Sequence, residues 1–216
     1  MGKRDLHKRV RIIAAGNNIQ DNAVVYEMSS ALQSRLIHLD LTVNKGDWVN
    51  WALGAGIDSR IIGFIEFKPD MLYTFDPNHS DHTYASPRTW EFVSKLISNK
   101  DVSNADLPLL AGTLGPGVAQ EFITYVQVYS QLPTIEDIIA KPETATVPSE
   151  ISMKYAMATF LADCMDQTNV KELVTYLLRL PVETRVVCLR MTNKRSPDLM
   201  QHKALQPLYQ DLMRLM

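Results

Sequence analysis

Three polar side chains occupy positions at which they could act on a bound anion. Asn17 ends an apolar run, Arg35 ends a short helical pattern, and Arg88 follows Ser86 and Pro87 at the start of another helical pattern. Ligands of open α/β sheets bind at the carboxyl ends of strands, and the free N–H groups of a helix start attract anions. A guanidinium adds charge-assisted hydrogen bonds. These residues therefore predict an anion site, although Arg88 also fits a plain solvated surface.

Two apolar runs predict a small parallel sheet that positions the first two residues. The run at 9–17 (RVRIIAAGN) is rich in β-branched residues, and a second run follows at 36–41 (LIHLDL). Strand, crossover of about twenty residues and strand make a right-handed βαβ unit. The first strand then ends at the ligand edge with Asn17, whereas the crossover helix runs back and ends at Arg35. We therefore expect Arg35 to face a neighbouring subunit.

From residue 43 onward the pattern is helical. Apolar residues at helical spacing, separated by capping residues and by proline or glycine stops, predict a succession of helices. We expect them at residues 45–56, 59–72, 86–99, 117–132, 134–140, 151–165, 170–180, 183–195 and 207–216. Pro69 interrupts the second, and the third has Ser86 as its N-cap and Pro87 in its first position. The chain is therefore predicted to be mainly α with a small α/β piece.

Composition limits the classes of protein to which the chain can belong. Its 216 residues suffice for one large domain or two small ones, and its 46% hydrophobic content supports a real core. With 22 basic and 24 acidic residues, nothing indicates nucleic-acid binding. No apolar stretch approaches the roughly 20 residues that span a bilayer, so no membrane segment is expected. Cys164 and Cys188 lie within helical patterns without CxxC spacing, which favours core positions in a cytoplasmic protein.

Other candidate sites have weaker signals. The loop 79–82 (HSDH), which Asp76 precedes, has metal-ligating residue types, but they lie in a single segment, so a polar loop without a metal is expected. No GxxxxGK[ST] loop is present, and the glycine-dense segment 112–117 has no lysine. The chain as given is therefore not expected to hydrolyse ATP by itself. Because two strands are not stable alone, and the first begins within about ten residues of Met1, we expect the chain to begin inside a domain.

Three fragments, in this order, resemble the second half of an AAA+ ATPase of the MoxR-like group. RIIAAGN resembles the sensor 1 strand, ALQSRLIHLDL the segment that carries the arginine finger, and YASPRTWEFVSKLI the sensor 2 helix of the lid. The likeness continues through WVNWAL, FIEFKPDML, GVAQEFITYV and the SQLP turn, and so covers most of the chain. The departure from the family lies upstream, because the Walker A and Walker B segments that should precede residue 9 are missing.

The resemblance implies a role for each of the three side chains. Asn17 would orient the attacking water or contact the γ-phosphate, and Arg88 would contact the phosphates of the same nucleotide. Arg35 would stabilise the transition state in the site of a neighbouring subunit. ATP with Mg²⁺ is the implied ligand of the complete ATPase, with no tight binding to this chain alone.

The family also implies an assembly and a domain plan. It implies a ring-shaped homo-oligomer, or association with the missing upstream half, that remodels a protein client. Residues 1–42 would be a partial nucleotide-binding subdomain, 43–104 a helical lid with sensor 2, and 105–216 a C-terminal helical region. An alternative from another class is a non-catalytic interaction or adapter protein with an ATPase-derived helical fold.

Overall fold

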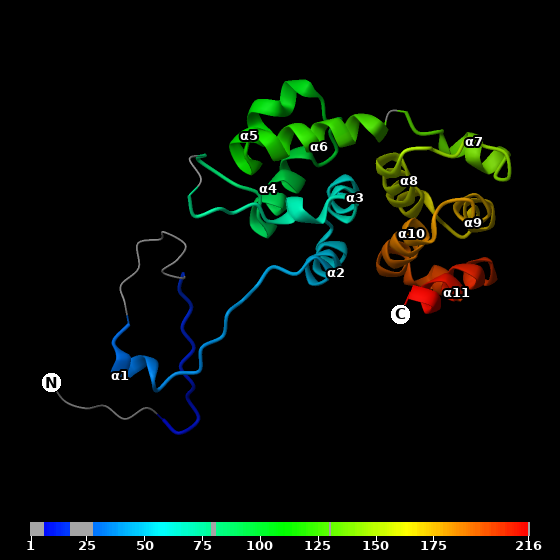
Figure 1. Ribbon diagram of the computed structural model, residues 1–216. Helices are drawn as coiled ribbons and strands as arrows, with labels where there is room; N and C mark the ends of the chain where they lie inside the picture. Colours follow the sequence, from blue (N-terminus) through cyan, green and yellow to red (C-terminus); the bar gives the residue numbers. More distant parts are fainter. Residues whose placement is uncertain (1–6, 18–27, 79–80, 130, 216) are drawn as a thin grey trace. The chain divides into compact units, whose positions relative to one another are not determined.

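The computed structural model of the chain describes residues 7–17, 28–78, 81–129 and 131–215. Contacts divide the chain into two units, drawn in Figure 1: residues 1–41 with 76–79, and residues 42–75 with 80–216. Throughout the described ranges the regular secondary structure is helical, and they contain no strand. This confirms the prediction of a mainly α-helical chain.

The first unit contains one short helix, α1 (Ser30–Gln33). The runs 10–17 and 36–41, where strands are predicted, are irregular and exposed, with Ile13 93% and Leu41 97% exposed. The predicted βαβ unit is therefore not formed by the described residues. The physical reason is that an extended run pairs its backbone and buries its side chains only beside further strands, and two strands alone are marginal in water.

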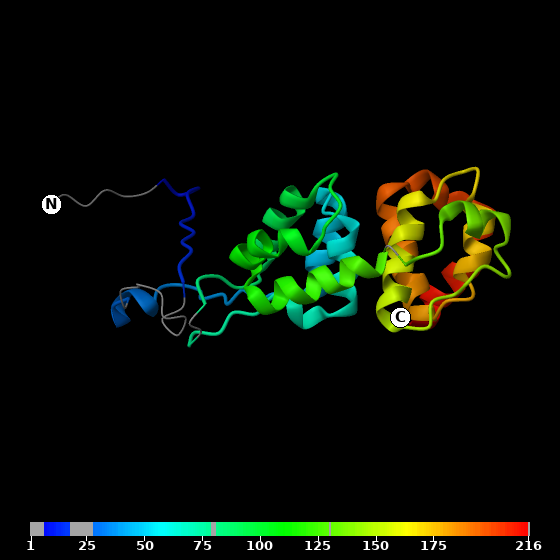
Figure 2. The ribbon, with the colours of Figure 1, turned by 90° about the horizontal axis from the view of Figure 1, so that it is seen from above.

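The second unit is built from helices that form two consecutive groups. The helices are α2 (Lys45–Ala55), α3 (Ser59–Phe67), α4 (Pro87–Ile97), α5 (Leu107–Leu114), α6 (Pro116–Tyr129), α7 (Ile135–Ala140), α8 (Ile151–Cys164), α9 (Val170–Leu177), α10 (Val182–Arg195) and α11 (Gln206–Leu215). Figure 2 separates a first helical group, α2–α6, from a second helical group, α7–α11. Because α5 packs against both α4 and α6, the helical packing is continuous across residue 104.

Local signals in the sequence explain where several helices begin and end. Ser86 caps α4 with Pro87 in the first position, as predicted. Helix α3 ends at Phe67, and a 3₁₀ turn starts at Pro69, which confirms the predicted interruption. Helix α2 ends at Gly56, whose φ of 72° lies in the left-handed region that favours glycine.

An aromatic cluster lies at the centre of the first helical group. The ring of Phe64 on α3 lies 5.6 Å from Trp90 on α4 and 5.4 Å from Phe122 on α6, and all three side chains are fully buried. Edge-to-face and tilted ring pairs of this kind add to the stabilisation from burial alone. The cluster therefore fixes α4 against α3 and α6.

The core of the second helical group combines aliphatic and sulfur-containing side chains with the fully buried ring of Tyr176. Met157 and Cys188 are fully buried, which confirms the predicted core role of these residue types, whereas Cys164 is half-buried. Both cysteines are free thiols. Among the described residues, no helix combines the length and the apolar character needed to cross a membrane.

Candidate functional site

Arg88 lies in the first turn of α4, and its backbone is held by a reciprocal cap. The Ser86 hydroxyl accepts a hydrogen bond from the Thr89 N–H (3.2 Å), and the Thr89 hydroxyl accepts one from the Ser86 N–H (2.7 Å). Trp90, two residues after Arg88, is fully buried, and its Nε1 donates a hydrogen bond to the Met71 carbonyl oxygen at 2.9 Å. The backbone of Arg88 is therefore fixed on both sides.

The Arg88 side chain is exposed and has no partner among the described residues. It forms no hydrogen bond or ion pair with any residue in the part of the chain that the structure describes, and the first turn of α4 contains no acidic residue. A cation at a helix N-terminus is unfavourable by about 0.3–1 kcal/mol unless an anion is nearby. Chemically, the arrangement can accept a phosphate or carboxylate.

Asn17 and Arg35 lie in the first unit, and both are exposed. Arg35 follows α1, and its Nη1 donates a hydrogen bond to the Ala31 carbonyl oxygen, so part of its guanidinium is occupied locally. No hydrogen bond joins Asn17 to Arg35. Arg88 belongs to the second unit.

The sequence alone does not predict a hydrogen-bond network around Asp58 and Arg60. Asp58 caps α3, and its carboxylate accepts hydrogen bonds from Arg60 Nε (2.9 Å) and Nη2 (2.7 Å). Arg60 also donates to the carbonyl oxygens of Ile97 (3.0 Å) and Lys100 (2.8 Å). The Asp58 hydrogen bond is the main cause of the raised pKa of Arg60. The network joins the start of α3 to the end of α4 and engages all three guanidinium nitrogens of Arg60.

The buried Tyr125 and the half-buried Tyr129 form a second polar cluster where α3, α6 and α8 meet. The hydroxyl of Tyr129 is hydrogen-bonded to the hydroxyl of Thr159, and burial raises the pKa of Tyr129 to about 12. Tyr125 is 3% exposed, its hydroxyl has no hydrogen-bond partner, and burial raises its pKa well above the usual value. These phenols stay protonated at neutral pH, so the cluster is suited to packing rather than to proton transfer.

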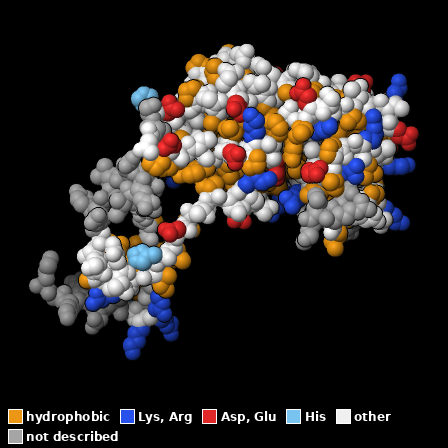
Figure 3. Space-filling view, in the orientation of Figure 1, with side chains coloured by type: hydrophobic (Ala, Val, Ile, Leu, Met, Phe, Trp, Pro, Cys, Tyr) orange, Lys and Arg blue, Asp and Glu red, His pale blue; other side chains and the backbone are white. Residues whose placement is uncertain are grey.

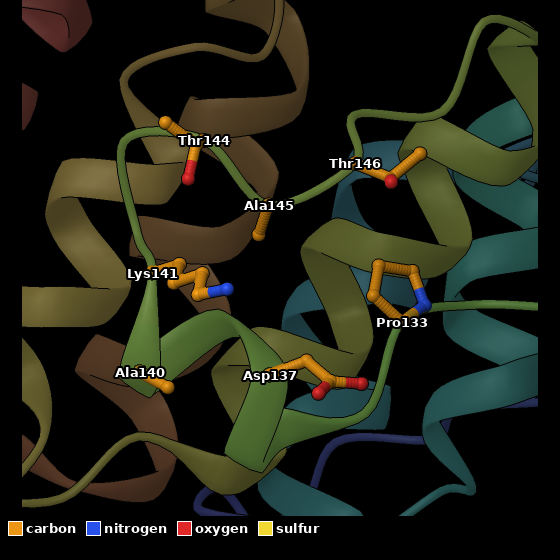
Figure 4. A pocket seen from close by; sticks show the side chains of 7 residues that line it. All are labelled: Pro133, Asp137, Ala140, Lys141, Thr144, Ala145 and Thr146. Atoms are coloured by element: carbon orange, nitrogen blue, oxygen red, sulfur yellow. The ribbon is translucent and has the colours of Figure 1, made fainter.

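A surface pocket of about 240 Å³ lies between α7 and the loop that follows it (Figure 4). Its polar side chains include Asp137 and Lys141, and Asp137 is already hydrogen-bonded to the Thr134 hydroxyl at 2.8 Å. None of the seven lining residues is buried, and none of the predicted side chains lies there. The pocket therefore offers no enclosed binding site.

The described residues contain no cluster of three or more histidine, cysteine, aspartate or glutamate side chains that could hold a metal ion. His79 of the 79–82 loop lies outside the described residues, so the structure leaves the expectation of a metal-free loop as a prediction. Figure 3 shows acidic and basic side chains interspersed over the visible face of the helices, with no large patch of one sign.

Comparisons with known proteins do not connect the chain to a family. No family model, no curated protein and no solved structure matches it.

Proposed function

We propose that the chain is the C-terminal part of a MoxR-like AAA+ ATPase. In this proposal Arg88 binds nucleotide phosphates from the lid, and Asn17 and Arg35 act in hydrolysis, with Arg35 serving the site of a neighbouring subunit. ATP with Mg²⁺ is bound by the complete ATPase, which forms a ring and remodels a protein client. The lid and the C-terminal region remain assigned to residues 43–104 and 105–216. The cytoplasm is the proposed location, in keeping with two free thiols.

The single observation that carries the proposal is the state of Arg88. Its backbone is fixed by the Ser86–Thr89 cap, while its guanidinium is exposed and has no described partner. A structural arginine is usually committed to partners, as Arg60 is here. Arg88 is instead held ready for an anion, which is what a phosphate-contacting lid arginine requires.

The first unit gives additional support. Ile12, Ile13, Leu39 and Leu41 are 75% to 97% exposed, although each would contribute about 1.5–3 kcal/mol if buried. We propose that residues 10–15 and 36–41 become strands when further strands of a nucleotide-binding subdomain lie beside them. The small α/β piece of the predicted fold is therefore part of this proposal.

The first test concerns the purified chain, which should show no Mg²⁺-dependent ATP hydrolysis because its sequence contains no GxxxxGK[ST] loop to cradle the phosphates. Appreciable turnover that disappears in Arg88→Ala would contradict this limit. The second test is the reading frame upstream of Met1. The proposal expects it to encode a GxxxxGK[ST] loop and a strand that ends in Asp-Glu.

A mixing experiment with the complete polypeptide tests the role of Arg35. Subunits with Arg35→Ala should be inactive as a homo-oligomer, as should subunits with a broken phosphate loop. Mixed rings should regain activity, because an intact subunit interface then offers Arg35 to an intact phosphate loop. Restoration would support action in trans, and its absence would count against it. Arg190→Ala is the matched control, since Arg190 is an exposed arginine on α10.

The exposed apolar runs also favour a second candidate, a non-catalytic adapter that buries residues 10–15 and 36–41 against a protein partner. The two candidates differ in the reading frame upstream of Met1. A stop codon with a promoter directly before Met1 would favour the adapter. An adapter also predicts that partner binding is unchanged by Arg88→Ala but lost when Ile13 and Leu41 are replaced by serine.

A further inference from the structure

The two helical groups of the second unit meet along a seam that includes Gly63 on α3 and Thr159 on α8. Of all helix pairs, α3 and α8 pack most extensively. A Cβ atom placed on Gly63 would lie 2.6 Å from Tyr125 Oη and 2.9 Å from Thr159 Cγ2, which is closer than real Cβ contacts. The absence of a side chain at Gly63 therefore permits this approach between helices.

A part-buried hydrogen bond between Tyr129 and Thr159 crosses the same seam. The Thr159 hydroxyl donates to the Ala156 carbonyl oxygen at 2.9 Å, so its only proton is used within α8. Tyr129, at the end of α6, must therefore be the donor in its hydrogen bond to Thr159. Breaking this contact would leave the half-buried Tyr129 hydroxyl and the buried Thr159 hydroxyl oxygen without this hydrogen bond, which opposes separation of α6 from α8.

Other contacts lie away from Gly63 and Thr159. The rings of Phe67 on α3 and Tyr155 on α8 have centroids 6.1 Å apart, and α2 packs against α10. The buried side chains of both helical groups belong to one continuous hydrophobic cluster. Contacts of α3 and α6 with α8, together with those of α2 with α10, join the two helical groups through several pairs of helices, which opposes relative motion of the groups. Relative motion is expected between parts unless their interface is large and hydrophobic, and the cluster that joins these two helical groups is hydrophobic.

We propose that α2–α6 and α7–α11 move as one rigid body, so that α7–α11 act as a lever that follows every rotation of α4 and Arg88. The source of that rotation, closure of a lid on a nucleotide, rests on the proposed function. The rigidity of the two helical groups does not depend on the proposed function. A client bound to α7–α11 would then be displaced whenever nucleotide binding moves α4.

The test measures distance distributions between two nitroxide labels on the purified chain, without nucleotide. Labels at Gln120 on α6 and Arg190 on α10 span the seam, and both positions are exposed. Labels at Asn50 on α2 and Gln120 give a matched reference within the first helical group. Cys164→Ser provides the background, because the remaining thiol of Cys188 is fully buried.

Rigid coupling predicts one distribution for Gln120–Arg190 that is as narrow as that for Asn50–Gln120. A broad or two-peaked distribution across the seam, beside a narrow reference, would overturn the proposal. Gly63→Ala should shift the mean distance of Gln120–Arg190, because the added methyl group would press on Thr159 of α8. An unchanged distance across the seam would show that Gly63 does not set the arrangement. Because no nucleotide is used, failure here is distinct from failure of the ATPase proposal.

Discussion

Gly63→Ala is expected to destabilise the chain, although alanine is the better helix former. The change gains about 1 kcal/mol of intrinsic helix propensity. Against this, the new methyl group would lie 2.6 Å from Tyr125 Oη and 2.9 Å from Thr159 Cγ2. Both neighbours are held in a packed core, and overpacking of this kind costs about 1–3 kcal/mol. The net loss is therefore about 0–2 kcal/mol.

Gly112→Ala is the matched control. Gly112 lies within α5, and a Cβ atom there would meet no atom within 4 Å. It should stabilise the chain by about 0.5–1 kcal/mol, because only the gain in helix propensity applies. Urea unfolding followed by circular dichroism should therefore separate the two variants by about 1–3 kcal/mol, at an unchanged m-value. If Gly63→Ala proves as stable as Gly112→Ala, the close contact at the seam does not exist.

Three further predictions follow from burial and exposure. Burial raises the pKa values of Tyr129 and Tyr176 from 10.0 to about 12, so above pH 10 the unfolded chain releases these protons while the folded chain keeps them. The free energy of unfolding should therefore fall between pH 10 and pH 12, and a constant value from pH 9 to pH 11.5 would refute this. The Cys188 thiol, whose pKa burial raises to about 12, should react with a thiol reagent at pH 8 only after unfolding, and fast reaction in the native state would be contrary evidence. Amides of residues 10–15 should exchange with solvent within seconds in a monomer, whereas amides of the buried helix α3 are slow; strong protection of 10–15 would show that strands form without a partner.

Features that depend on a few adjacent residues could be predicted from the sequence. The cap of α4 needs only Ser86, Pro87 and Thr89, and the end of α3 needs only the proline two residues later. The position of Arg88 at a helix start follows from the same local signal. Burial of Cys188 likewise follows from its apolar neighbours.

Features that depend on distant partners could not be predicted in this way. The hydrogen bond between Arg60 and the Ile97 carbonyl oxygen spans 37 positions, and that between Tyr129 and Thr159 spans 30. The sequence identifies Asp58 as a possible helix cap. The link to α4, however, depends on the hydrogen bond from Arg60 to the Ile97 carbonyl oxygen, which forms only in the folded chain. The strands predicted at 9–17 and 36–41 are the reverse case, because their sequence pattern is strong, whereas the described residues form no strand, since pairing needs neighbouring strands.

The most direct test of the ATPase proposal is the kcat/KM for ATP of the complete ATPase polypeptide with Arg88→Ala, measured beside Arg190→Ala. Hydrogen bonds to a charged group are worth about 1.5–3 kcal/mol, which corresponds to a loss of about 10- to 150-fold for Arg88→Ala. Arg190→Ala should retain the activity of the unchanged protein. Equal values for the two variants would contradict the assignment of Arg88 as a phosphate-binding residue.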